Sequence, residues 1–202
     1  MGYFVVDGKK YACIVDGSHR QLPTRAITLK NIVPNPSFEN DTGWGGTIPT
    51  DATYALYGSR SAKLQSTTVG RSEPTAIQPQ VGHIYYGRTN IFSNGAAIAA
   101  ADNRFEWYAG DGYGLNYIFA RNDGAYSAWT MLSAIIPVEA VNASGYVIRN
   151  FVVAAQNPCW TDGLMIVDLT EAFGAGNEPT QEWCDQNIPF FEGEFTMEVL
   201  GL

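Results

Sequence analysis

Apolar and polar residues alternate with a period of two over many short segments of this chain, as they do in half-buried β-strands. Turn-forming pairs such as Asn94-Gly95 and Asp162-Gly163 separate these segments. The strands predicted in the central region are residues 61–65, 83–93, 104–108, 114–121, 126–136, 146–155 and 164–168. Short strands separated by such turns predict an all-β fold, an antiparallel β-sandwich of the jelly-roll type.

The first residues predict a separate β-hairpin. Tyr3–Val6 and Lys9–Val15 are rich in β-formers, and Asp7-Gly8 between them suits a type I′ turn, which needs positive φ at both central residues. Because an isolated hairpin is marginal in water, we expect it to dock on the main domain or on another subunit. Residues 21–30 are predicted to be a connector. The first unit is therefore residues 1–30, and the sandwich is residues 31–169.

The last unit, residues 170–202, differs in character from the strands before it. Thr180 is predicted to cap a short helix over Gln181–Asn187, and Pro189 ends that helix. Three aromatic residues then follow that are too apolar to be left in water: Phe190, Phe191 and Phe195. We expect them to pack on the sandwich or on a neighbouring subunit.

Composition narrows the classes of partner. The 202 residues include 12 Lys+Arg and 20 Asp+Glu, a net charge of −8. This balance disfavours binding to nucleic acid and to anionic membranes, which both require clustered basic side chains. No stretch of 18 apolar residues is present to span a bilayer. Cys13, Cys159 and Cys184 are odd in number and widely spaced, so we expect reduced, mostly buried thiols.

Several segments resemble known families. Asn35–Glu39 with Thr42-Gly43-Trp44, Tyr57–Leu64 and Trp160–Asp162 occur in the order found in jelly-roll carbohydrate-binding modules that accompany xylanases and cellulases. Asp168–Thr180 is similar to a segment that recurs in bacteriophage and prophage tail proteins after such a sandwich. Together they imply a tail or minor structural protein with a carbohydrate-module-like domain.

The resemblance directs attention to strand faces that mix aromatic and polar groups. Along residues 83–93, Tyr86, Arg88 and Asn90 share one face, and on the next strand Glu106 and Tyr108 share another. Aromatic rings can stack on the C–H faces of sugars, while planar polar groups bind hydroxyls. We therefore predict these five residues as the carbohydrate-binding site. The alternative is a solvated outer sheet face, which commonly carries Tyr and Arg as well.

The resemblance also implies a structural Ca²⁺, because Glu39 and Asp162 match positions that hold one in such modules. Calcium prefers hard oxygen ligands, and backbone carbonyls near Asn35, Ser59 and Ser61 could complete the shell. The alternative is that Glu39 makes hydrogen bonds within its own turn. Both interpretations stay open at this point.

The function that the resemblance implies is non-enzymatic recognition of a bacterial surface glycan by a module associated with a phage tail. Its partners would be that glycan, other tail proteins and further copies in a homo-oligomer. The N-terminal residues lack the apolar centre of a secretory signal, so we expect synthesis in the bacterial cytoplasm and a final place in the virion. The alternatives are a purely structural tail protein and a glycan-processing enzyme or its ancillary module.

Overall fold

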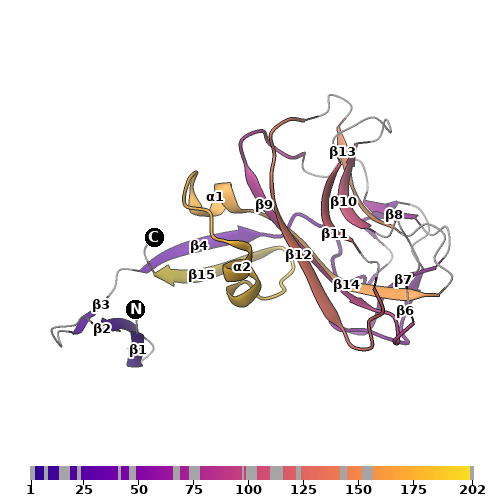
Figure 1. The fold of residues 1–202 in the computed structure, drawn as a ribbon, viewed down its shortest axis with the longest axis horizontal. Helices are drawn as coiled ribbons and strands as arrows, with labels where there is room; N and C mark the ends of the chain where they lie inside the picture. The colour runs from indigo at the N-terminus through magenta and orange to yellow at the C-terminus, as the bar shows by residue number, and fades with distance from the viewer. Residues whose placement is uncertain are drawn as a thin grey trace.

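The computed structural model describes residues 3–6, 9–13, 19–21, 24–40, 42–45, 49–65, 69–72, 78–96, 98, 104–109, 116–121, 124–141, 145–151 and 157–200. Two five-stranded antiparallel sheets form the body of the molecule (Figure 1). The first, which we name the β10 sheet, has the order β11 (Tyr117–Arg121), β10 (Arg104–Ala109), β13 (Tyr146–Phe151), β8 (Val69–Ser72) and β5 (Trp44–Gly45). The second, the β9 sheet, has the order β12 (Thr130–Pro137), β9 (Ile84–Phe92), β14 (Cys159–Asp168), β7 (Ser61–Leu64) and β6 (Thr50–Asp51).

The main core lies between these two sheets, as the alternating pattern predicts. Tyr85 from β9 meets the edge of Trp107 from β10, with ring centroids 4.7 Å apart. Gly87 is required on β9, because a Cβ at that position would lie 2.2 Å from the Phe119 ring. The other buried members of this core include Phe38, Phe105, Ile148, Leu164 and Ile166. The predicted antiparallel β-sandwich is confirmed.

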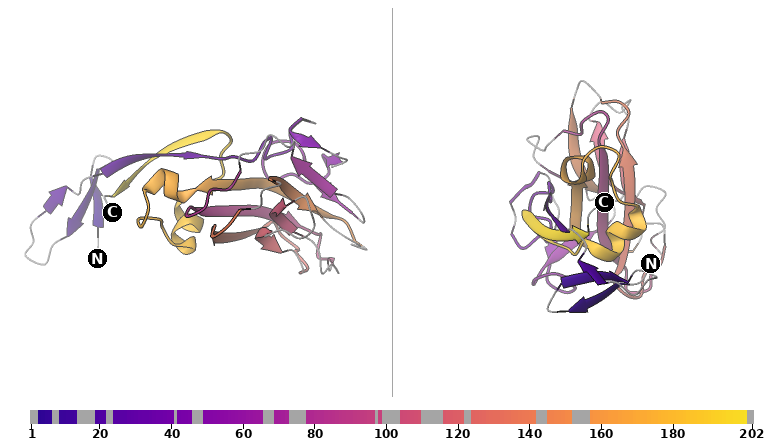
Figure 2. Two further views of the ribbon diagram at one scale, coloured as in Figure 1. Left: turned by 90° about the horizontal axis from the view of Figure 1, so that it is seen from above. Right: turned by 90° about the vertical axis from the view of Figure 1, so that its left-hand side faces the viewer.

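Two smaller sheets lie outside the sandwich. The N-terminal sheet consists of β1 (Tyr3–Val6), β2 (Lys9–Cys13) and β3 (His19–Gln21), and it contains the predicted hairpin. The ribbon pairs β4 (Thr24–Lys30) with β15 (Glu194–Leu200) in antiparallel register. Figure 2 shows the ribbon running along the molecule toward the N-terminal sheet. The segment predicted as a connector, residues 21–30, therefore contains strand β4, which pairs with β15 near the end of the chain.

A second core joins the tail to the β9 sheet. Helix α1 (Leu169–Phe173) begins at Asp168, whose side chain accepts a hydrogen bond from the Glu171 N–H. Helix α2 (Gln181–Asn187) is the predicted one, and Thr180 caps it by accepting from the Trp183 N–H. Buried apolar residues from both helices, the ribbon and the outer face of the β9 sheet meet there: Ile27, Leu29, Tyr86, Met165, Val167, Leu169, Phe173, Cys184, Ile188, Phe191 and Val199.

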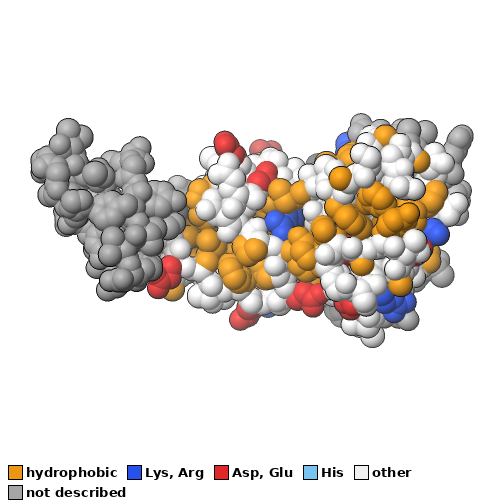
Figure 3. All heavy atoms as spheres, turned by 90° about the horizontal axis from the view of Figure 1, so that it is seen from below, with side chains coloured by type: hydrophobic (Ala, Val, Ile, Leu, Met, Phe, Trp, Pro, Cys, Tyr) orange, Lys and Arg blue, Asp and Glu red, His pale blue; other side chains and the backbone are white. Residues whose placement is uncertain are grey.

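This second core gives the tail aromatics the packing expected of them, since Phe190 and Phe195 also contact it. In the space-filling view, hydrophobic side chains also lie at the surface, in a band along this face of the molecule (Figure 3). Among the described residues, no helix has the length and apolarity needed to cross a membrane.

Candidate functional site

The outer face of the β10 sheet carries a group of charged and aromatic side chains that contact one another. Phe105 and Trp107 point into the core, so Arg104, Glu106 and Tyr108, which alternate with them on β10, lie on the opposite side. The strand register then decides their neighbours. Glu106 is paired with Arg149 on β13.

Glu106 is the centre of an ion-pair cluster. The Nε and Nη2 atoms of Arg149 both donate to Glu106 Oε1, with the Nε bond at 2.8 Å. Arg104 Nη1 lies 3.7 Å from Glu106 Oε2. The glutamate is 0% exposed although it is on an outer face, because these two arginines cover it. The carboxylate accepts from Arg149 and lies within ion-pair distance of Arg104, so it orients both guanidinium groups.

Tyr108 extends this cluster. The guanidinium carbon of Arg149 lies 3.6 Å from the centroid of the Tyr108 ring, the geometry of a cation–π contact. Tyr108 is half-buried, and so is Arg149, whose side chain is 15% exposed. Tyrosine, guanidinium and carboxylate are thus held together in one rigid arrangement on regular strands.

The charge of this face is opposite in sign to that of the whole chain. Arg121 pairs in register with Arg104 and is exposed, which places three arginines beside a single glutamate. The face is therefore net positive in a protein whose net charge is −8. Such a local positive field attracts anionic groups.

The other predicted binding residues lie elsewhere. Tyr86, Arg88 and Asn90 are on β9, in the other sheet, and they are 0%, 4% and 6% exposed. The tail covers the first two, because the Tyr86 hydroxyl donates to Asp185 Oδ1 at 2.8 Å and Arg88 Nη1 donates to the Ile188 carbonyl at 2.9 Å. Asn90 Nδ2 lies 3.3 Å from the carbonyl of Asp162. The structure therefore divides the five predicted residues, and brings only Glu106 and Tyr108 together.

Sequence reasoning did not select Arg149, Arg104 or Arg121 as site residues. Arg149 lies in the predicted strand of residues 146–155, but its pairing with Glu106 depends on which strand lies beside β10. The neighbour of β10 on that side is β13, about forty residues further along the chain. Alternation within a strand assigns a face and contains no information about that neighbour.

Glu39 and Asp162, the predicted calcium ligands, both accept hydrogen bonds from one turn. Glu39 Oε1 accepts from the N–H groups of Ser59 and Arg60 at 2.9 and 2.8 Å. Asp162 Oδ2 accepts from the N–H groups of Leu56 and Tyr57 at 2.8 and 2.9 Å. Gly58 at the centre of this turn has φ +72°, and a Cβ there would lie 2.5 Å from the Glu39 carboxyl carbon.

These contacts test whether a cation fits. Backbone N–H groups and a cation compete for the same carboxylate lone pairs, and here the turn presents N–H groups to both carboxylates. Among the described residues, no three His, Cys, Asp or Glu side chains are grouped so that they could hold a metal ion. The donor set therefore fits a hydrogen-bonded turn better than a calcium site, and calcium binding stays a prediction.

The environments of the two carboxylates differ. Burial raises the pKa of Asp162 to about 6, against the opposing effect of its N–H donors and with a contribution from the negative charge of Glu39. Burial acts to raise the pKa of Glu39 as well, but hydrogen bonds from Ser59 and Arg60 bring it below the ordinary value. Asp162 is thus a buried acid whose charge the fold disfavours.

Comparisons with known proteins give similarities of architecture. No protein-family model matches the chain, and no curated protein sequence matches it. A family 16 carbohydrate binding module is similar in structure over 68% of this chain and 99% of its own, with 17% identity and a TM-score of 0.48. The C-terminal family 22 carbohydrate binding module of Clostridium thermocellum Xyn10B is similar over 70% of this chain and 92% of its own, with 14% identity and a TM-score of 0.48.

A third similar structure is the enzymatically active domain of tailspike protein 4 from bacteriophage CBA120. It covers 68% of this chain, which spans 21% of that domain, with 13% identity and a TM-score of 0.40. All three similarities concern the arrangement of strands, and nothing about the ligand of this chain follows from them.

Proposed function

We propose that the outer face of the β10 sheet binds carbohydrate without catalysing a reaction on it. The observation that carries this proposal is the cluster of Tyr108, Arg149 and Glu106, in which a guanidinium lies 3.6 Å from a tyrosine ring and is fixed by a buried carboxylate. The ring offers a surface for sugar C–H groups. The fixed guanidinium groups offer planar donors for hydroxyl or carboxylate oxygens.

The single carboxylate supports binding rather than hydrolysis. Glycosidases use two carboxyl groups that flank the scissile bond at a defined separation. Glu106 is the one acidic side chain among the described residues of β10, β11 and β13, and two arginines hold it. The described residues of these strands therefore lack the second carboxyl group that hydrolysis of a glycosidic bond would need.

The surplus of arginine specifies the class of sugar. Arg104, Arg121 and Arg149 outnumber the acidic group of this face, so a polysaccharide with carboxylate or phosphate substituents matches it better than a neutral one. We propose an acidic bacterial surface glycan as the ligand. Because the arginines are partly exposed, this electrostatic contribution should weaken as salt increases.

The setting we propose is a bacteriophage tail, based on the resemblance of Asp168–Thr180 to tail proteins. A purely structural tail protein is the second candidate, and one observation favours it. The ribbon of β4 and β15 and the N-terminal sheet carry the chain away from the sandwich, as attachment elements would (Figure 1). The two candidates differ in whether the sandwich itself binds a ligand.

The test is isothermal titration of the full chain with polygalacturonate, with dextran as the neutral counterpart. Binding to the acidic polymer should be at least tenfold tighter at 50 mM than at 500 mM NaCl. Tyr108→Ala and Arg149→Ala should each weaken it about tenfold, the equivalent of about 1.4 kcal/mol. Arg25→Ala is the matched control, because it removes an exposed arginine from the ribbon.

Binding that is equal for both polymers would contradict the acidic specificity. No binding to either polymer, nor to acidic polysaccharide purified from bacterial walls, would favour the purely structural candidate.

A further inference from the structure

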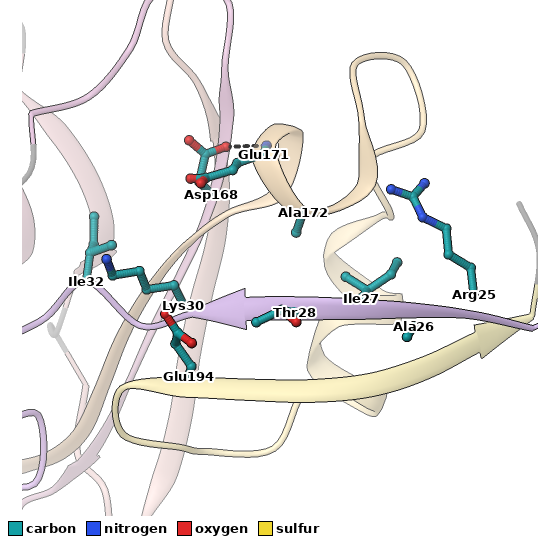
Figure 4. Close-up of a pocket in the computed structure, with 10 residues that line it drawn as sticks. All are labelled: Arg25, Ala26, Ile27, Thr28, Lys30, Ile32, Asp168, Glu171, Ala172 and Glu194. Carbon is teal, nitrogen blue, oxygen red and sulfur yellow. Dashed lines mark hydrogen bonds between the residues drawn. The ribbon is translucent and has the colours of Figure 1, made fainter.

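A groove of about 410 Å³ lies between strand β4 on one side and helix α1 with the end of β14 on the other (Figure 4). Four consecutive residues of β4, Arg25–Thr28, line it. Successive residues of a strand face opposite sides of the sheet, so a groove lined by consecutive residues runs along the edge of the strand and not over one face. The carbohydrate-binding proposal does not involve any residue of this groove.

That edge of β4 is open. Among the described residues, β4 is hydrogen-bonded to a strand on one side only, by β15. Figure 4 shows β15 on that side and α1 across the groove on the other. An open edge presents a row of backbone N–H and C=O groups, and the backbone of another extended segment satisfies such a row. A helix does not, because its backbone groups bond within the helix.

The register of the ribbon identifies the backbone groups on this edge. The Asn31 N–H donates to the Gly193 carbonyl at 2.8 Å, one step beyond the paired residues of β4 and β15. Hydrogen-bonded and non-bonded pairs alternate along an antiparallel ladder, so every second residue of β4, counted back from Asn31, directs its N–H and C=O away from β15. Three of these residues are Ala26, Thr28 and Lys30, and all three line the groove.

The charge of the chain is concentrated around this groove. Residues 1–167 contain twelve acidic and twelve basic side chains and are neutral as a whole. Residues 168–200, which form the end of β14, both helices and β15, contain eight acidic side chains and no Lys or Arg, so they account for the whole net charge of −8. Five of the eight are exposed: Glu171, Glu182, Glu192, Glu194 and Glu198. Such a negative field attracts a basic partner.

The lining of the groove has the same sign. Asp168, Glu171 and Glu194 lie near Lys30 at one end, which leaves that end net negative. Arg25 lies toward the other end, where it donates to a backbone carbonyl of α1 at 3.3 Å.

The floor of the groove is apolar and includes Ile27, Ile32 and Ala172. A segment that lies against both the floor and the acidic side chains needs apolar and basic residues on its two faces. Alternation of the two kinds along an extended chain provides this arrangement.

We propose that the β4 groove binds an extended segment of a partner protein in which basic and apolar residues alternate, and that this segment adds to the ribbon as a third strand. Its backbone pairs with the outward N–H and C=O groups of Ala26, Thr28 and Lys30. The acidic side chains around the groove select a basic segment over an acidic one. This proposal is independent of carbohydrate binding.

The experiment is an NMR titration of the ¹⁵N-labelled full chain with the peptide acetyl-Thr-Val-Lys-Val-Lys-Val-Thr-amide, up to 2 mM. We expect saturable binding, with slower hydrogen exchange at the amides of Ala26 and Thr28. Exchange at Ile27 and Leu29 should stay the same, because their amides are already bonded to β15. The counterpart with Glu in place of both Lys should bind at least tenfold more weakly. So should the basic peptide with Pro in place of its central Val, because proline removes a ladder donor.

Variants of the chain locate the site. Glu171→Lys should weaken binding of the basic peptide at least tenfold, and Ala26→Pro should abolish it by removing an outward N–H while the ladder to β15 stays intact. Glu198→Lys is the matched control, because Glu198 is an exposed glutamate of the ribbon outside the groove and its replacement changes the net charge equally. A melting temperature within 2 °C of the wild type shows that each variant is folded.

Four results would overturn the proposal. The first is the absence of saturable binding up to 2 mM, and the second is equal affinity for the basic and acidic peptides. The third is equal affinity for the peptide that contains proline, which would exclude strand addition without any variant of the chain. The fourth is a loss in Glu198→Lys as large as that in Glu171→Lys, which would show attraction by the whole acidic end and no site in the groove.

Discussion

The outer faces of the two sheets have the same kind of sequence and different surroundings. On β9, Tyr86 and Arg88 alternate with core residues, and on β10, Glu106 and Tyr108 do the same. The tail covers the β9 face, where its hydrogen-bond partners come from Asp185 and from the residue after helix α2. The β10 face has no helix over it among the described residues.

The difference shows that one composition supports two roles. On the β9 face, tyrosine and arginine act as interior donors that attach the tail to the sandwich, because burial requires their polar groups to be paired. On the β10 face, tyrosine and arginine are held by one another and by Glu106 on the outer side of the sheet, where we propose that a ligand binds. The first pair of experiments below compares the two faces directly, and the later ones test the buried Asp162 and its turn.

The largest effect should come from Arg88→Ala. Arg88 is 4% exposed, donates to the Ile188 carbonyl, and lies 3.6 Å from the Met131 sulfur. Its removal leaves a cavity and an unpaired carbonyl, so we expect a loss of about 3 kcal/mol in the free energy of unfolding. In a protein of this size that lowers the melting temperature by roughly 6–12 °C. Denaturant unfolding followed by circular dichroism measures it.

Arg149→Ala is the counterpart on the β10 face. It removes a partly exposed arginine from the buried Glu106, which keeps Arg104 as a partner, so its cost should be about 2 kcal/mol, less than that of Arg88→Ala, while glycan binding falls. If Arg88→Ala and Arg149→Ala lower the free energy of unfolding equally, the proposed difference between the two faces is wrong: Arg88 would not attach the tail more firmly than Arg149 holds its own cluster.

A pH titration tests the buried acid of the β9 sheet, Asp162. Burial raises the pKa of Asp162 to about 6 from an ordinary value of 3.8. A raised pKa means that the folded state holds the proton more tightly than the unfolded state does. The stability from this group is complete below pH 3.8 and is lost as the pH rises through about 6.

The measurement is the difference in unfolding free energy between the wild type and Asp162→Asn from pH 4 to pH 7. Over this range the wild type should lose up to about 3 kcal/mol relative to the variant, since each unit of pKa shift corresponds to about 1.4 kcal/mol. Subtracting the variant removes the pH-dependent contribution of all the other carboxylates, which both proteins share. A difference that does not vary with pH would contradict the raised pKa.

The sequence predicted those features that depend on neighbours within a strand or a helix. Seven of the ten sandwich strands (β7 and β9–β14), the N-terminal hairpin and the Thr180-capped helix follow from alternation, turn residues and capping. The short strands β5, β6 and β8 were not predicted, because two to four residues are too few to show a period of two. Helix α1 escaped detection because five residues are too few to show a helical period. Strands β4 and β15 escaped it because their pairing joins residues more than 160 positions apart.

In the candidate site, too, the sequence predicted which face of a strand each residue lies on, and not what covers that face. The faces of Glu106 and Tyr108 followed from the period of two, but the cover over Tyr86 and Arg88 is built from residues about a hundred positions later. Nothing local distinguishes a tyrosine that will donate to Asp185 from one that will lie beside an arginine. The choice between a binding face and an attachment face is a property of the tertiary structure.

The smallest expected effect concerns metal, at the turn that joins Glu39 and Asp162. If this turn holds Ca²⁺, chelation should lower the melting temperature, because a ligand bound only by the folded state stabilises it. The hydrogen bonds described above satisfy both carboxylates with N–H groups of Leu56–Arg60, so we expect a melting temperature unchanged within 1 °C in 5 mM EDTA. Differential scanning calorimetry with and without 5 mM CaCl₂ makes the comparison.

Glu39→Gln is informative in both cases, because it retains the shape of the side chain but loses its charge. A decrease in the wild type that Glu39→Gln abolishes would establish the calcium site, and would show that the turn rearranges to present carbonyl oxygens where it now presents N–H groups.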